Sequence, residues 1–91
     1  MAVVGLTKSA ALEVAGTGVR VNVVAPGTTD TGMLTRFTDT DANKAALVST
    51  VPLKRLATPE EIAHVIAFVS SANASYMTGA SIPVDGGNLA D

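Results

Sequence analysis

The sequence predicts an α/β fold with two parallel strands, and three observations support this. Residues 19–24 are rich in valine and alternate in the way a β-strand does, and residues 80–84 have the character of a second short strand. Between them, residues 58–69 carry the strongest helix signal of the chain. Strands connected through helices pair in parallel with right-handed crossovers. Because two strands are too few for an independently stable sheet, we interpret residues 1–91 as a single partial domain.

The first element is a helix over residues 2–15. Val3, Leu6, Ala10 and Val14 recur at helical spacing, and Gly16 stands where a glycine would end the helix. The predicted order is therefore helix, tight turn and strand.

The segment from 31 to 50 carries weaker signals. Residues 33–37 are compatible with one short helical turn, and Asp39 or Asp41 is a candidate cap for a helix over 42–49. The segment is polar and rich in threonine, which is typical of a surface connection or of a mobile lid over a site.

The start of the helix at 58–69 is well defined. Thr58 is a candidate cap, Pro59 suits the first helical position, and Glu61 at the third position completes a capping box. Ile62, Val65, Ile66 and Val69 then form an apolar stripe, with Phe68 beside it. After this helix, Thr78-Gly79 and Asp85-Gly86-Gly87 predict turns on either side of the second strand. Pro83 favours an edge position for that strand, because proline cannot donate to a ladder.

Composition excludes several classes of function. The net charge is −2 and the six basic residues are scattered, with only Lys54 and Arg55 adjacent, so the sequence predicts no nucleic-acid surface. The absence of cysteine rules out disulfides, cysteine zinc sites and thiol catalysis. No apolar run is long enough to span a membrane, and the N-terminal segment lacks the features of a signal peptide. We therefore expect a cytoplasmic protein without a membrane partner.

The loop after the first strand is the candidate site. Pro26 and Gly27 end the strand pattern, and Thr28, Thr29 and Thr31 offer hydroxyl and backbone N–H groups just beyond it. Ligands bind at the carboxyl ends of strands in open parallel sheets. A plain Pro-Gly turn is the alternative interpretation.

Other polar residues have structural explanations. We expect Asn22 to hydrogen-bond local backbone groups from its strand, and Glu60 and Glu61 to serve the helix start. For Arg55 we expect a solvated or structural role, with pairing to a carboxylate or positioning of the lid as alternatives. His64 has no Asp or Cys near it in sequence, so we assign it no ligand or base role. The sequence thus predicts no metal site.

Four blocks resemble the C-terminal part of the short-chain dehydrogenases/reductases, which are NAD(P)-dependent oxidoreductases with a Rossmann fold. AVVGLTKSAALE at 2–13 resembles the helix that follows their catalytic Tyr-x-x-x-Lys, and VRVNVVAPG at 19–27 resembles their sixth strand and Pro-Gly turn. PLKRLATPEEIA at 52–63 resembles the approach to their last helix, and TGASIPVDGG at 78–87 resembles their last strand. The style is most similar to the bacterial 3-oxoacyl-acyl-carrier-protein reductases and related dehydrogenases. The resemblance implies a partial Rossmann-like fold.

The resemblance also implies a cofactor site. Pro26, Gly27, Thr29 and Thr31 match the family's Pro-Gly-x-x-x-Thr segment. There the backbone around the position of Thr29 contacts the nicotinamide carboxamide of NAD or NADP, and the hydroxyl at the position of Thr31 hydrogen-bonds the cofactor. Full binding also needs the family's pyrophosphate and adenosine pockets.

The family's catalytic residues and phosphate loop do not match any part of the sequence. Gly-x-x-x-Gly-x-Gly, the catalytic Ser and Tyr-x-x-x-Lys are absent, and Tyr76 is followed four residues later by Ala80 instead of Lys. Met1 falls just after the position of the catalytic Lys. The leading hypothesis is a truncated oxidoreductase that binds no cofactor and catalyses nothing alone. The alternatives are a non-catalytic module that forms homo-oligomers, or one half of a split enzyme with a separate N-terminal half.

Overall fold

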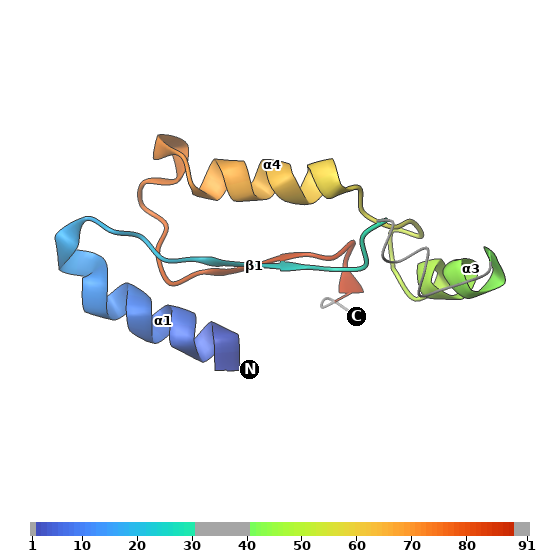
Figure 1. The fold of residues 1–91 in the computed structure, drawn as a ribbon, viewed down its shortest axis with the longest axis horizontal. Helices are drawn as coiled ribbons and strands as arrows, with labels where there is room; N and C mark the ends of the chain where they lie inside the picture. The colour runs from blue at the N-terminus through green and yellow to red at the C-terminus, as the bar shows by residue number, and fades with distance from the viewer. Residues whose placement is uncertain (1, 31–40, 89–91) are drawn as a thin grey trace.

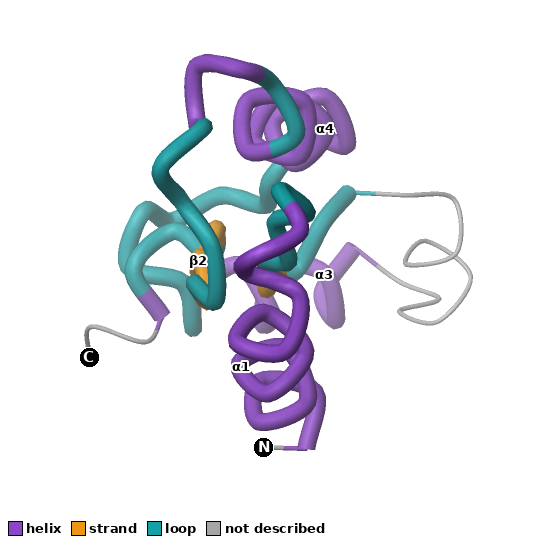
Figure 2. The backbone as a smooth tube through the Cα atoms, turned by 90° about the vertical axis from the view of Figure 1, so that its left-hand side faces the viewer, coloured by secondary structure: helices purple, strands orange, loops and turns teal. Residues whose placement is uncertain are grey.

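A computed structural model describes residues 2–30 and 41–88 of the chain. Helix α4 covers one face of a two-stranded sheet and α1 lies on the other, while α3 lies beyond one end of the strands (Figures 1 and 2). This three-layer arrangement confirms the predicted α/β class. The elements follow in the order α1 (Ala2–Val14), η1 (Ala15–Thr17), β1 (Val23–Pro26), α3 (Asp41–Ser49), α4 (Pro59–Val69), η2 (Ala72–Ala74) and β2 (Ser81–Val84).

The two strands pair in parallel, as predicted, with Val23 opposite Ser81 and Pro26 opposite Val84. The predicted start of β1 at Val19 is wrong, because the ladder begins only at Val23. Just before it, the Asn22 side chain takes the place of ladder groups: its Nδ2 donates to the Met77 carbonyl (3.1 Å) and its Oδ1 accepts from the Ala80 N–H (3.0 Å). Asn22 therefore bonds backbone groups as predicted, but the expectation of local partners is wrong, because Met77 and Ala80 are more than fifty residues away.

Helix α1 ends differently from the prediction. After Val14 the chain tightens into the 3-10 turn η1, and the residue in the left-handed region is Gly18 (φ 85°), not Gly16. The Thr17 hydroxyl donates to the Val14 carbonyl (2.7 Å) and so satisfies a group at the helix end. The extra turn moves the point where the chain reverses by two residues.

Helix α1 packs through its small residues. Thr7 and Ala11 are buried, whereas Val3 and Leu6, two members of the predicted apolar stripe, are 62% and 70% exposed. Ala11 lies close to the sheet side, because a Cβ placed on Gly79 would be 3.5 Å from the Ala11 Cβ. A helix that approaches backbone this closely presents small side chains, so the larger ones remain outside.

Helix α4 begins with the predicted capping box. The Thr58 hydroxyl accepts from the Glu61 N–H (3.2 Å), and the Glu61 carboxylate accepts from the Thr58 N–H (2.9 Å). Along the helix Val69 is buried and Ile62 and Val65 are partly covered, as the predicted stripe requires. The stripe is incomplete, since Ile66 is about half exposed.

The predicted helix at 42–49 is confirmed as α3, and the predicted second strand as β2. The predicted turns are present, with Gly79, Gly86 and Gly87 all in the left-handed region. The predicted helical turn at 33–37 and the proposed Asp39 cap lie outside the described residues.

The molecule is extended and has a small core. Its radius of gyration is 15.7 Å, against about 12 Å for a compact domain of this length. Its surface area is 6246 Å², against about 4,900 Å² for a monomer of this mass. Within 2–30 and 41–88, the buried apolar side chains are only Ala11, Val51, Val69 and Ala74. None of the helices in this part of the chain has the length and apolar character needed to cross a membrane.

Candidate functional site

The carboxyl ends of β1 and β2 lie at the same edge of the sheet, because the strands are parallel. Pro26 ends β1 opposite Val84, which ends β2. The pairing continues for one more residue, since the Gly27 N–H donates to the Val84 carbonyl (2.9 Å). The predicted Pro-Gly segment and the turn that begins at Asp85 are therefore neighbours.

Gly27 is required by the close approach of these two segments. A Cβ on Gly27 would be 2.8 Å from the Asp85 Cα, a distance that real Cβ atoms essentially never show, and 3.0 Å from its Cβ. The Asp85 backbone is kept close to Gly27, because the carbonyl of the preceding residue, Val84, accepts the Gly27 N–H (2.9 Å). Gly27 thus permits a contact that any larger residue would prevent.

The loop after Gly27 is held by the segment that precedes α4. The Ala57 N–H donates to the Thr28 carbonyl (3.1 Å), and the Asp30 N–H donates to the Ala57 carbonyl (2.8 Å). These two bonds form a single parallel bridge between Thr29 and Ala57. In such a bridge the N–H and C=O of the central residue point away from the partner strand.

The bridge consequently leaves the backbone groups of Thr29 without a partner among the described residues. Neither its N–H nor its C=O bonds to another described residue, while its hydroxyl donates to the Gly27 carbonyl (3.1 Å) and fixes the loop conformation. A donor and an acceptor on one residue match the two complementary groups of a primary carboxamide. Of the four predicted site residues, Pro26 ends β1, Gly27 follows it and Thr29 lies in the loop, whereas Thr31 lies outside the described residues.

A charged brace fixes the segment at 55–58. Arg55 forms a bidentate pair with Glu61, with Nη1 to Oε1 at 2.7 Å and Nη2 to Oε2 at 2.8 Å. The hydrogen bonds from Arg55, with that from the Thr58 N–H, lower the pKa of Glu61 to about 2, and the same pair raises the pKa of Arg55. Of the alternatives for Arg55, the structure thus shows the pairing with a carboxylate. The brace ties the start of α4 to the residues that hold the loop.

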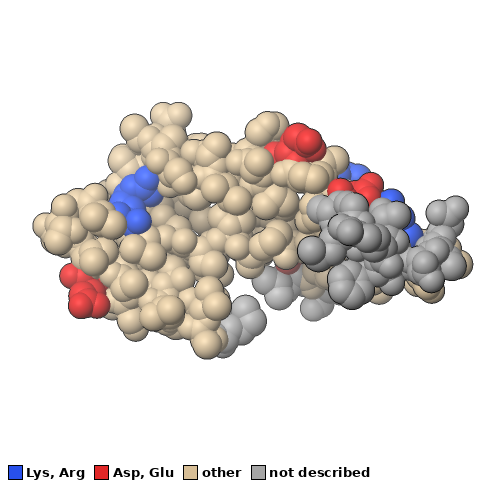
Figure 3. Space-filling model, in the orientation of Figure 1, with Lys and Arg blue, Asp and Glu red and all other residues tan. Residues whose placement is uncertain are grey.

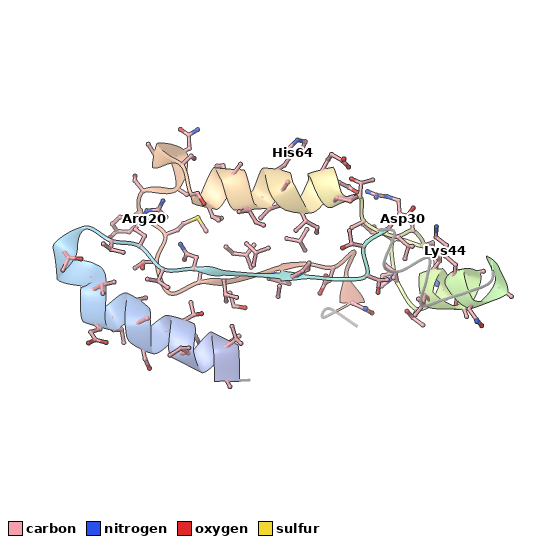
Figure 4. All side chains as sticks on the ribbon, in the orientation of Figure 1. Arg20, Asp30, Lys44 and His64 are labelled. Atoms are coloured by element: carbon pink, nitrogen blue, oxygen red, sulfur yellow. The ribbon has the colours of Figure 1, made fainter. Side chains whose placement is uncertain are left out.

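Sequence reasoning missed Arg20. Its guanidinium donates to the Met77 carbonyl (3.0 Å) and the Ser71 carbonyl (3.2 Å), and so joins the approach to β1 to the connection between α4 and β2. Figure 4 shows Arg20 at the opposite end of the strands from Asp30 and Lys44. Nothing in the local sequence pattern indicates these partners, because they lie more than fifty residues away.

The remaining polar candidates form no site. His64 is exposed and points away from the sheet in Figure 4. In the described ranges no three His, Cys, Asp or Glu side chains are grouped to bind a metal ion.

Residues 1–88 match the family model described as enoyl-(acyl carrier protein) reductase. The chain belongs to the short-chain dehydrogenase/reductase family. It is 48% identical over 85 residues to the 3-oxoacyl-[acyl-carrier-protein] reductase MabA of Mycobacterium tuberculosis, an alignment that covers 93% of this chain and 34% of that protein. The predicted resemblance is confirmed. The chain spans about a third of the length of the curated relatives it matches.

Solved structures of short-chain dehydrogenases/reductases share the fold. A short chain dehydrogenase family protein from Francisella tularensis superposes with a TM-score of 0.90 at 36% identity, covering 99% of this chain and 41% of that one. A putative 2-deoxy-D-gluconate 3-dehydrogenase from Agrobacterium tumefaciens with bound NADP gives a TM-score of 0.87 at 42% identity, covering 98% and 36%.

Replacing Gly27 with Ala is expected to destabilise the protein by about 1–3 kcal/mol, because the new methyl group collides with the Asp85 backbone. Urea unfolding followed by circular dichroism measures the change. Gly5→Ala is the matched control: Gly5 lies within α1 with no atom near its Cβ position, so the same change there should stabilise by up to about 1 kcal/mol. Equal effects at the two positions would contradict the close approach at Gly27.

Glu61→Gln is expected to lower stability at neutral pH, because the bidentate pair with Arg55 loses its charge. The folded-state pKa of about 2 lies below the ordinary 4.5, so the pair stabilises fully above pH 4.5. Its contribution is lost as the pH falls from 4.5 through 2. Unfolding midpoints of both proteins across this range should therefore converge.

Glu60→Gln provides the control, because Glu60 is adjacent and forms no ion pair with a described residue. Its effect at neutral pH should be the smaller of the two. A difference between wild type and Glu61→Gln that stays constant down to pH 2 would refute the role of the brace.

Proposed function

We propose that this chain forms the C-terminal part of an NAD(P)-dependent oxidoreductase and supplies the backbone that receives the nicotinamide carboxamide. The observation that carries this proposal is that the N–H and C=O of Thr29, just past the carboxyl end of β1, have no partner within 2–30 and 41–88. The agreement with the family's Pro-Gly-x-x-x-Thr segment supports it. The bound cofactor would exchange a hydride with the substrate: NAD(P)H would give it to a carbonyl carbon, and NAD(P)⁺ would accept it from an alcohol.

The chain's own residues have positioning roles in this proposal. Gly27 allows the loop to lie against Asp85, and the hydroxyl of Thr29 holds the loop through the Gly27 carbonyl. Thr31 completes the proposed set of Pro26, Gly27, Thr29 and Thr31. The phosphate loop and the acid that protonates a carbonyl have no counterpart among these 91 residues, so we propose that the chain alone neither binds cofactor nor catalyses turnover.

The test uses a hybrid in which residues 1–88 replace the matching C-terminal third of the MabA relative. Thr29→Pro removes the backbone N–H and is expected to weaken NADP⁺ binding about tenfold, the value of one hydrogen bond in a closed site. Fluorescence titration of the hybrid measures the dissociation constant. Thr29→Ser retains both the N–H and the hydroxyl, and should change the dissociation constant less than threefold.

Two results would overturn the proposal. One is a Thr29→Pro hybrid that folds and binds NADP⁺ as the parent hybrid does. The other is cofactor-dependent turnover of a ketone or alcohol by the 91-residue chain alone.

A second candidate function is association, and the exposed apolar side chains favour it. Val3, Leu6 and Leu12 on α1 and Ile66 and Phe68 on α4 are each 49–81% exposed. Since these residues lie on helices that cover opposite faces of the sheet, the molecule offers two apolar surfaces (Figure 1). We propose that the chain forms homo-oligomers through them; a complementing N-terminal half is the alternative partner.

Light scattering distinguishes association from a monomeric chain. We expect a dimer or larger species at micromolar concentration, and Leu12→Ser should weaken it about tenfold or more, because a large apolar side chain no longer becomes buried. Lys8→Gln, on the same helix, is the control and should leave the assembly unchanged. A monomer at every concentration would contradict self-association.

A further inference from the structure

Three of the six basic residues, which are scattered in the sequence, line one open groove. Lys44 comes from α3, and Lys54 and Arg55 come from the turn before α4. The groove has a volume of about 520 Å³, within the range of small-molecule sites. Its other lining residues are the acidic Asp30 and the apolar Ala45, Val48 and Leu56, so basic and apolar side chains line the same groove. Figure 3 shows basic and acidic atoms close together at this end of the molecule, where Figure 4 labels Asp30 and Lys44.

The groove has an excess of positive charge in a chain whose net charge is −2. Lys44 pairs with Asp30 (3.0 Å) and Arg55 pairs with Glu61. The Lys54 ammonium instead donates to the Ser49 carbonyl at the end of α3 (2.9 Å) and forms no ion pair with a described carboxylate. No described carboxylate therefore competes with a ligand for the other two donor positions of that ammonium.

Lys54 is also held in an unusual backbone conformation. It is the non-glycine residue with a positive φ (59°) in the described part of the chain, a conformation that favours Gly or Asn. The turn is fixed on both sides, since the Lys54 N–H donates to the Val51 carbonyl (2.8 Å) and the Leu53 N–H to the Gly86 carbonyl (3.1 Å). Non-glycine residues held in a left-handed backbone conformation are often found at functional sites.

The groove adjoins the Thr29 loop. Asp30 directly follows Thr29, and Leu56 precedes Ala57, whose backbone holds that loop. A molecule that reacts beside the loop would therefore have its far end within reach of the groove.

We propose that this groove binds a monoanionic head group attached to a short apolar tail, with Lys54 as the principal cation and Val48 and Leu56 in contact with the tail. Its assignment to the substrate end remote from the reacting carbonyl rests on the proposed function. Binding of the anion itself needs no cofactor and no turnover, so it is measured independently.

The experiment is a ¹H–¹⁵N NMR titration of the 91-residue chain with sodium octanoate, octan-1-ol and inorganic phosphate. Octanoate should shift the amides of Lys44, Val48, Lys54 and Leu56 in a saturable manner. Octan-1-ol and phosphate should each bind at least about fivefold more weakly, because each lacks either the charge or the tail.

Lys54→Asn removes the charge and suits the left-handed backbone, so the fold is preserved. It should weaken octanoate binding about fivefold. Lys8→Gln removes a charge on α1, away from the groove, and should leave the affinity unchanged. The proposal is overturned by absence of saturable octanoate binding, by equal affinity for octanoate and either control molecule, or by equal effects of the two variants. Because the Thr29 hybrid reports cofactor binding, its failure would be seen separately from a failure here.

Discussion

The parallel pairing of β1 with β2 is the interaction on which the rest of the structure depends. It joins segments almost sixty residues apart, as the bond between Asn22 and Ala80 illustrates. Closing a connection of that length costs conformational entropy, which burial against α1 and α4 offsets only in part, since so few side chains are fully covered. The chain therefore relies on hydrogen bonds. Just before β1, Arg20 and Asn22 add side-chain bonds to the backbone bond between the Gly79 N–H and the Val21 carbonyl.

The same pairing creates the candidate site. Parallel strands bring Gly27 and Asp85 to one edge, and the brace between Arg55 and Glu61 sets Ala57 against the loop. The bridge to Ala57 uses the Thr28 carbonyl and the Asp30 N–H. It leaves the N–H and C=O of Thr29 without a partner among the described residues. The proposed cofactor contact and the basic groove thus adjoin the same loop around Thr29, which the segment at 55–58 holds.

Much of the fold and of the candidate site could be predicted from residues that are close together in the sequence. The capping box of Thr58 and Glu61, the helix over 42–49 and the Pro-Gly loop all follow from residues within a few positions of one another. The features that sequence reasoning missed depend on tertiary contacts. The start of β1 is set by the Asn22 side chain, the buried face of α1 by close approach to Gly79, and the basic groove by the meeting of α3 with the turn at Lys54 and Arg55. No local pattern encodes these distances.

Amide hydrogen exchange at Thr29 tests the central claim most directly. In the hybrid without cofactor, the Gly27 amide should be protected by the Val84 carbonyl, whereas the Thr29 amide should exchange rapidly. Saturation with NADP⁺ should protect Thr29 and leave Gly27 as it was. A Thr29 amide that is protected before cofactor is added, or that exchanges at the same rate afterwards, would contradict the claim that this loop receives the nicotinamide.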